Sequence, residues 1–460
     1  MQKTLFIKIG LVFILAMLIN IPLGMMGNLV NERQGRQAQV TGEIANSYAE
    51  PQFISGPVLV LPYTEEYPVR AEGRDSDDKG NATHTRIQRR SAALYLTPHT
   101  LSARGTLATD TKKRSLFRVP VYTLDSNWQG SFEIPARLDA PRRSDSSHVT
   151  WGRPYLSLAV NDPRGFASAP LLELDGKAVS VEQGSGLSIA PGGVRAMLDS
   201  AVLQRAGTHT FKLALKLRGT SQLRVIPLAD SLKMELASNW PHPGFEGRFL
   251  PLPESQHVGA DGFRANWEVS SLATNAQARL TQAMATPSSC HDANCLDSFD
   301  VRLVTPGNIY QQSDRALKYG FLFISITFAA FFLFEILKRL AIHPAQYTLV
   351  GLALAMFFLL MLSLSEHMAF TLAYLIAASA CVVLVGYYLG HVMRGAWRGA
   401  GFAALLSACY AALYGLLISE DNALLMGSLL LFVLLTVAMI VTRKFDWYGI
   451  NANAEGTSSI

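Results

Sequence analysis

The chain has 460 residues, enough for two or three domains, and 49% of them are hydrophobic while only 16% are charged. Because an average soluble protein is about 25% charged, this composition argues against a wholly soluble protein. The formal net charge of +5 is not gathered into a basic stripe with interleaved aromatic residues, so we expect no nucleic-acid partner. The apolar excess lies in residues 5–26 and after residue 318, on either side of a long segment of soluble character.

The N-terminus has the features of an uncleaved membrane anchor. Lys3 and Lys8 precede an apolar run from Ile9 to Met26. At 1.5 Å per residue this run spans about 27 Å, close to the thickness of the hydrocarbon core. No small-x-small cleavage site follows it, which favours an anchor over a removable signal peptide. We therefore predict a transmembrane helix within residues 1–28.

Five further apolar runs are each long enough to cross a membrane. They lie near Tyr319–Leu337, Tyr347–Leu364, Met368–Leu389, Gly399–Ile418 and Ala423–Val441. With six spans, one set of connections contains the basic residues Lys3, Lys8, Lys338, Arg339, Arg394, Arg398, Arg443 and Lys444. The opposite short loops, "SLSEHM" and "SEDN", contain no Lys or Arg. The positive-inside rule then places both termini in the cytoplasm. We predict an external domain over 29–317, a five-helix bundle over 318–445 and a cytoplasmic tail over 446–460.

The external domain has the pattern of a β-rich fold. Short runs such as "GPVLVLPY", "LFRVPVYTL" and "TFKLALKLRG" alternate partly between apolar and polar residues, and turn clusters such as "DPRG" and "APGG" separate them. A succession of strands with few helical stretches favours an antiparallel sandwich. The fold class expected for the whole chain is a polytopic α-helical membrane protein with six transmembrane helices and a large sandwich-like β domain between the first two.

Two features of the external domain are candidate sites. In "SNWPHPGFEG", Trp240 and Pro241 precede His242, which Pro243 follows, so the turn is stiff. A structural corner explains these residues together, while a partner-contact loop and a catalytic or ligating His242 remain alternatives. In "CHDANC", a local disulfide between Cys290 and Cys295 is favoured outside the cytoplasm, with free thiols or a metal site as alternatives.

The membrane segments contain few ionisable residues, and all lie near the ends of the spans. We identify Glu335, Glu366 and His367 as candidate polar groups at the membrane interface, and Lys338 is three residues from Glu335, within reach on a helix. Since a proton-coupled transporter usually keeps an ionisable residue at the midplane, transport is disfavoured. Alanines recur every fourth residue at Ala400, Ala404, Ala408 and Ala412, which we assign to packing within the bundle, with homo-oligomerisation as an alternative.

Catalytic signatures are absent from the sequence. It contains no G-x-S-x-G, H-E-x-x-H, P-loop or dinucleotide-binding pattern. We therefore expect a protein that is not an enzyme and that has no cofactor and no catalytic or metal-binding residues. An enzyme acting through His242 or the "CHDANC" cluster remains a third hypothesis.

The chain resembles the CreD family of bacterial inner-membrane proteins over almost its whole length. The resemblance rests on "GPVLVLPYTE" at 56–65, "VNDPRGF" at 160–166, "SNWPHPGFEG" with "FLP" at 249–251, and "DWY" at 446–448. Between them stand "SDRALKYGFLFISITFAAFFLFE" at 313–335 and "HPAQYTLVGLALAMFFLLMLSLSEH" at 343–367. Several long matches in the right order make the resemblance specific.

The resemblance implies a multi-pass protein of the bacterial inner membrane, with a periplasmic domain and a role in cell-envelope integrity or stress response. It supplies no catalytic residues, and the "CHDANC" pair is not part of the family pattern. We expect the periplasmic domain to bind a partner without catalysis, with membrane lipids and other envelope proteins as the expected partners. The alternative is a transporter or lipid-handling protein that uses the C-terminal bundle.

Overall fold

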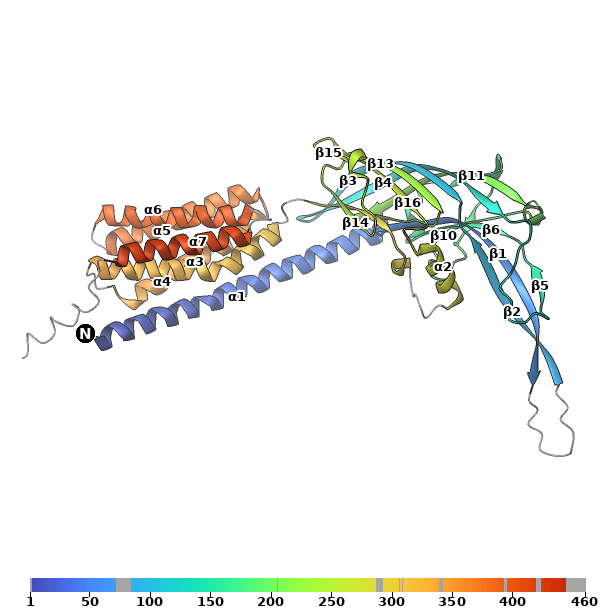
Figure 1. Cartoon of the computed structure of the whole chain (residues 1–460). Helices are drawn as coiled ribbons and strands as arrows, with labels where there is room; N and C mark the ends of the chain where they lie inside the picture. The colour runs from blue at the N-terminus through green and yellow to red at the C-terminus, as the bar shows by residue number, and fades with distance from the viewer. Residues whose placement is uncertain are drawn as a thin grey trace, which may run out of the picture. The chain divides into compact units, whose positions relative to one another are not determined.

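The computed structural model describes residues 2–71, 84–204, 206–286, 293–305, 307, 309–338, 342–392, 395–418 and 423–443. The chain divides into two compact units, one of Met1–Ala38 with Gly307–Ile460 and the other of Gln39–Pro306. The first is helical and the second is rich in β-strands (Figure 1).

The helical unit contains the expected apolar helices. They are α1 (Gln2–Ser47), α3 (Ile309–Lys338), α4 (Pro344–Ser365), α5 (Phe370–Val392), α6 (Ala396–Ile418) and α7 (Ala423–Thr442). Among the described residues, five helical segments are long and apolar enough to span a membrane, in α1, α3, α4, α5 and α6. This confirms a polytopic helical membrane protein. Helix α7 occupies the sixth expected run, and the count of six spans stays a prediction.

Helix α1 continues past the predicted anchor to Ser47, so its C-terminal end belongs to the β-rich unit. Within the helical unit, Ile19 and Leu23 of α1 belong to the same buried cluster as the aromatic core of α3–α6. That core is built from Phe323, Phe331, Tyr347, Phe357, Phe358, Tyr374, Phe402 and Tyr410. Rings from different helices meet at short range, as where the centroids of Phe357 and Tyr410 are 4.5 Å apart. Aromatic side chains therefore fill the interior of the described bundle.

The contact between α5 and α6 corrects the prediction about small residues. Ala400, Ala404 and Ala408 are exposed, so they do not pack within the described bundle, whereas Ala412 is half-buried next to Phe323 of α3. The close approach is made instead by glycines: a Cβ on Gly399 would lie 2.6 Å from Cα of Gly390. Small residues on the facing sides of two membrane helices let their backbones come this close.

The β-rich unit contains two sheets. The described strands are β1 (Gln52–Ala71), β2 (His84–Leu96), β3 (Thr100–Arg114), β4 (Phe117–Ile134), β5 (His148–Trp151), β6 (Tyr155–Val160), β7 (Leu171–Leu174), β8 (Lys177–Val179), β9 (Glu182–Gln183), β10 (Gly193–Met197), β11 (Gly207–Thr220), β12 (Gln222–Ile226), β13 (Ser231–Ser238), β14 (Pro243–Gly247), β15 (His257–Gly259), β16 (Gly262–Ser270) and β17 (Phe299–Leu303). In the described part, one sheet of nine strands has the order β14-β17-β12-β1-β6-β10-β9, with β2 and β5 also paired to β1. The other has eight strands in the order β15-β16-β13-β3-β4-β11-β7-β8.

One hydrophobic core serves both sheets. Strict alternation along β3 buries Leu101, Ala103 and Leu107 on one face, and these residues cluster with Leu156 and Val225 of the nine-stranded sheet. Helix α2 (Ala276–Ala285) covers a second apolar cluster formed with residues of β1 and β6. A large β-rich domain is thus confirmed, but its strands are not all antiparallel, because β1 pairs with β12 and β13 with β3 in parallel.

Candidate functional site

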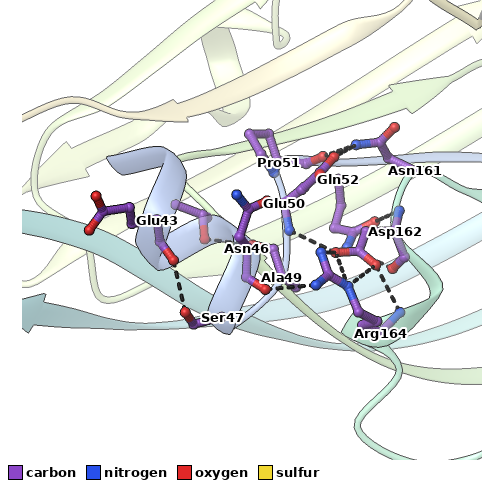
Figure 2. A network of polar contacts seen from close by, with 11 residues as sticks. Glu43, Asn46, Ser47, Ala49, Glu50, Pro51, Gln52, Asn161, Asp162 and Arg164 are labelled. Carbon is purple, nitrogen blue, oxygen red and sulfur yellow. Dashed lines mark hydrogen bonds and ion pairs between the residues drawn. The ribbon is translucent and has the colours of Figure 1, made fainter. Parts of the chain in front are cut away.

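The segment "NDPRG" after β6 forms a compact polar junction with the end of α1 and the start of β1 (Figure 2). Asp162 is the N-cap of a short 3-10 helix, Pro163–Gly165, and its carboxylate accepts a hydrogen bond from the Arg164 N–H at 3.0 Å. Pro163 suits the first helical position because no N–H is needed there. A Cβ on Gly165 would lie 2.5 Å from the carbonyl oxygen of Arg218, so the close approach of two backbones requires glycine.

The Asp162 carboxylate and the Arg164 guanidinium form a two-pronged ion pair. Nε donates to Oδ1 at 2.9 Å and Nη2 to Oδ2 at 2.8 Å. The guanidinium also donates from Nη1 to the carbonyl oxygen of Asn46, in the last turn of α1, at 2.6 Å. Arg164 thus satisfies a helix carbonyl that has no partner within the helix itself.

The chain leaving α1 is held on the same junction. The Glu50 N–H donates to Oδ2 of Asp162 at 3.1 Å. The buried Gln52 amide exchanges two hydrogen bonds with the Asp162 backbone, at 3.0 and 3.1 Å. The Thr220 hydroxyl donates to the carbonyl oxygen of Ala49 at 2.6 Å. We call this group of Asn46, Ala49, Glu50, Gln52, Asp162 and Arg164 the Asp162 junction.

The electrostatics of the junction suit a structural role. Burial raises the pKa of Asp162, but hydrogen bonds from the Arg164 side chain and from the Glu50 and Arg164 backbones outweigh it, and the net shift is downward. Hydrogen bonds to the Asp162 carboxylate in turn raise the pKa of Arg164. Both groups stay charged near neutral pH, so the pair is poorly suited to general acid–base catalysis.

The Trp240–Pro243 turn connects the two sheets. It follows β13 of the eight-stranded sheet and leads into β14 of the nine-stranded sheet. Trp240 packs against the shared core, and its indole Nε1 donates to the Val304 carbonyl oxygen at 2.9 Å. The His242 carbonyl oxygen accepts from the Val304 N–H at 3.1 Å, whereas the His242 side chain is exposed. These contacts favour a structural corner, and the contact role of the turn stays a prediction.

The outward face of the eight-stranded sheet carries two adjoining hollows. Its side chains form registered rows across the strands. The first row reads Glu268, Lys233, Ser102, Gln129, Lys212 and Glu173. The second reads Asn266, Glu235, Arg104, Asn127, Ala214 and Leu171. Hollows of about 670 and 790 Å³ lie over these rows and share Ser102, Gln129 and Lys212 as lining, so they form one continuous groove.

The predicted membrane-interface groups make contacts at opposite ends of α4. Glu335 is buried, and its carboxylate accepts hydrogen bonds from the Tyr347 hydroxyl at 2.7 Å and the Ile342 N–H at 3.2 Å. The side chain of Lys338, its expected partner, lies outside the described side chains. Beyond the end of α4, Glu366 forms an ion pair with Arg33 of α1 and accepts a hydrogen bond from the Tyr310 hydroxyl of α3, each at 3.3 Å.

His367 is exposed, and its backbone N–H donates to the Leu364 carbonyl oxygen at 3.0 Å, as in an ordinary turn. Cys290 lies outside the described residues, and the predicted disulfide to Cys295 stays a prediction. Among the residues that the structure describes, no three His, Cys, Asp or Glu side chains gather closely enough to hold a metal ion.

Our sequence interpretation missed both the groove and the Asp162 junction. The groove rests on β3, β13 and β16, whose regular alternation, as in "SLKMELAS", is the period-two signal of a strand with one buried face. This alternation made the strands themselves predictable, but the sequence contains no local signal for their order in the sheet or their register. The acid and the base of "DPRG" were visible, but the distant partners of Asp162 and Arg164 come from residues 46–52, more than a hundred positions away.

Comparison with known proteins gives one consistent result. The model of a protein family described as inner membrane protein CreD matches residues 4–448 of the chain. The inner membrane protein CreD of Escherichia coli (strain K12) is 34% identical over 450 residues, which cover 97% of this chain and 95% of that relative.

Proposed function

We propose a function for this chain on the premise that it belongs to the CreD family of inner membrane proteins. The chain is a multi-pass membrane protein that contributes to cell-envelope integrity or the response to envelope stress. Its β-rich domain acts by binding, without catalysis, and the helices anchor it. The expected partners are membrane lipids and other envelope components.

The single observation that carries this proposal is the open, polar groove on the eight-stranded sheet. The groove is lined by side chains from six neighbouring strands, and no residue of a described helix is among its lining. Its acidic and basic groups pair with each other, as in the 2.9 Å contact between Arg104 and Glu235. Side chains of this kind bind polar groups.

The orientation that we propose follows from the basic residues. Six spans, with α7 as the last, place both chain ends in the cytoplasm and the β-rich domain, with its two sheets forming a sandwich, in the periplasm. Arg398 and Arg443 then lie on the cytoplasmic side together with Lys3 and Lys8. The domain would face the cell wall and the outer membrane, where an envelope function needs it.

Entry of an apolar dye into cells that lack this protein tests the proposal. We expect the deletion to leak, and both the full chain and residues 1–305, the β-rich domain on its α1 anchor, to restore the barrier. Restoration by the full chain alone would favour lipid handling or transport by the bundle, although aromatic side chains fill the described interior. An unchanged barrier in the deletion would contradict the envelope function.

A further inference from the structure

The groove on the eight-stranded sheet has the chemistry of a carbohydrate-binding surface. Neighbouring strands in a sheet lie about 4.8 Å apart, so a row crossing six strands from β16 to β7 is roughly 24 Å long. The rows run across the strands, and the two adjoining hollows follow them. The groove therefore suits an extended ligand that lies across the strands.

The charges along the groove cancel. Its cations are Arg104, Lys212 and Lys233, and its anions are Glu173, Glu235 and Glu268. Arg104 contacts Glu235 at 2.9 Å, and Lys233 contacts Glu268 at 3.0 Å. Lys212 stands opposite Glu173 in register. A surface that binds nucleic acid or anionic lipid headgroups needs an excess of positive charge, which this groove lacks.

The remaining polar groups are amides and hydroxyls. Asn127 and Gln129 of β4 are exposed and lie next to Ser102 and Arg104 of β3 in register. Each amide both donates and accepts hydrogen bonds, as sugar hydroxyls do. Asn266 of β16 is half-buried and also lines the groove, so it adds a third amide to this surface.

A protein or peptide partner fits the groove less well. The cores of protein interfaces are rich in aromatic residues, but Trp128 and Trp267 point into the domain core and are only 2% and 1% exposed. Leu171 is the large apolar side chain that the described lining exposes, at 72%. Peptides that add a strand to a sheet need a free edge, whereas this groove presents the face of paired strands.

We propose that the groove binds an extended, uncharged oligosaccharide, such as the glycan chain of a cell-wall polymer. Asn127, Gln129 and Asn266 hydrogen-bond the sugar hydroxyl or acetamido groups, and Leu171 contacts an apolar sugar face. This inference rests on the proposed periplasmic binding function and specifies its ligand class.

Calorimetric titration of the full chain in lipid nanodiscs tests this inference. Chitohexaose, whose sugars carry acetamido groups, and cellohexaose, whose sugars carry only hydroxyls, serve as probes. The test variant is Asn127→Ala with Gln129→Ala, which removes two of the amides that bind the sugar, and the control is Lys216→Ala. Lys216 is exposed on the neighbouring strand β11, but it pairs with Asp125 and does not line the groove. The altered side chains point to solvent, and circular dichroism checks that each variant folds.

We expect saturable binding of one or both probes, roughly tenfold weaker in the double variant and unchanged in the control, because two hydrogen bonds are lost. Stronger binding of chitohexaose would identify acetamido sugars as the ligand, and equal binding would identify the hydroxyls as the recognised groups. No saturable binding of either probe, or equal binding by the double variant, would overturn the inference. A leaking deletion with no glycan binding would leave the envelope function standing and remove only this ligand.

Discussion

Replacement of Asp162 by alanine tests whether the Asp162 junction holds the β-rich unit to the end of α1. The carboxylate accepts hydrogen bonds from the Arg164 side chain and from the N–H groups of Arg164 and Glu50. Only the Asp162 side of this ion pair is buried, because the Arg164 side chain is 55% exposed and regains water. We therefore expect a cost of about 2 kcal/mol, below the cost of about 3–5 kcal/mol that is typical of a fully buried pair.

Chemical denaturation of the full chain in detergent measures this change. Unfolding of the β-rich unit is followed by tryptophan fluorescence, because Trp128 and Trp267 are buried in its core. The matched control is Asp125→Ala, which removes a carboxylate that is 59% exposed and paired with Lys216, and which we expect to cost less than about 1 kcal/mol. If Asp162→Ala shifts the midpoint no more than Asp125→Ala does, the junction does not stabilise the domain and our reasoning is wrong.

Three further predictions concern pH, the bundle and the turn between the sheets. The folded-state pKa of Asp162 is lowered. Its carboxylate therefore stabilises the domain above about pH 4, and this stabilisation is lost as the pH falls further, which gives the curve of stability against pH an acid limb. Asp162→Asn should flatten this acid limb in thermal unfolding. Gly399→Val should destabilise the bundle by about 1–3 kcal/mol in detergent unfolding, whereas Gly401→Val, with no atom near its Cβ, should not. Trp240→Phe keeps an aromatic ring but loses the 2.9 Å hydrogen bond from the indole Nε1 to the Val304 carbonyl oxygen, and should cost about 1 kcal/mol of domain stability. An acid limb that Asp162→Asn leaves unchanged would contradict the role of the Asp162 carboxylate. Equal effects of the two glycine variants would contradict the contact between α5 and α6, and an unchanged stability of Trp240→Phe would contradict the role of the hydrogen bond to Val304.

The apolar helices were predictable because their signal is local. A run such as Tyr347–Leu364 must be helical to satisfy its backbone in lipid, and the structure places it in α4. Which side of each helix contacts its neighbours was harder to predict from the sequence. The alanine stripe at 400–408 looked like a contact face, yet α6 uses Gly399 against α5, because the rotation of each helix depends on all its neighbours.

In the β-rich domain, sequence reasoning found several strands but not their arrangement. The expected strands "GPVLVLPY" and "TFKLALKLRG" lie in β1 and β11. That β13 pairs in parallel with β3, across more than a hundred residues, has no local signal. The groove depends on this pairing, because it brings Lys233 next to Ser102 and Gln129. The side chains of the groove were therefore visible as polar strand residues, but their shared surface was not.

The side of the membrane on which the β-rich domain lies tests the central claim most directly. A membrane-impermeant maleimide is added to cells whose outer membrane alone is permeabilised and which carry the full chain with Leu272→Cys or Trp397→Cys. These side chains are 97% and 91% exposed, and the unsubstituted chain gives the background. We predict that the cysteine at 272 is labelled while the inner membrane is still closed and the cysteine at 397 only after the inner membrane is opened. Labelling at 272 only after opening would place the domain in the cytoplasm and contradict the envelope function.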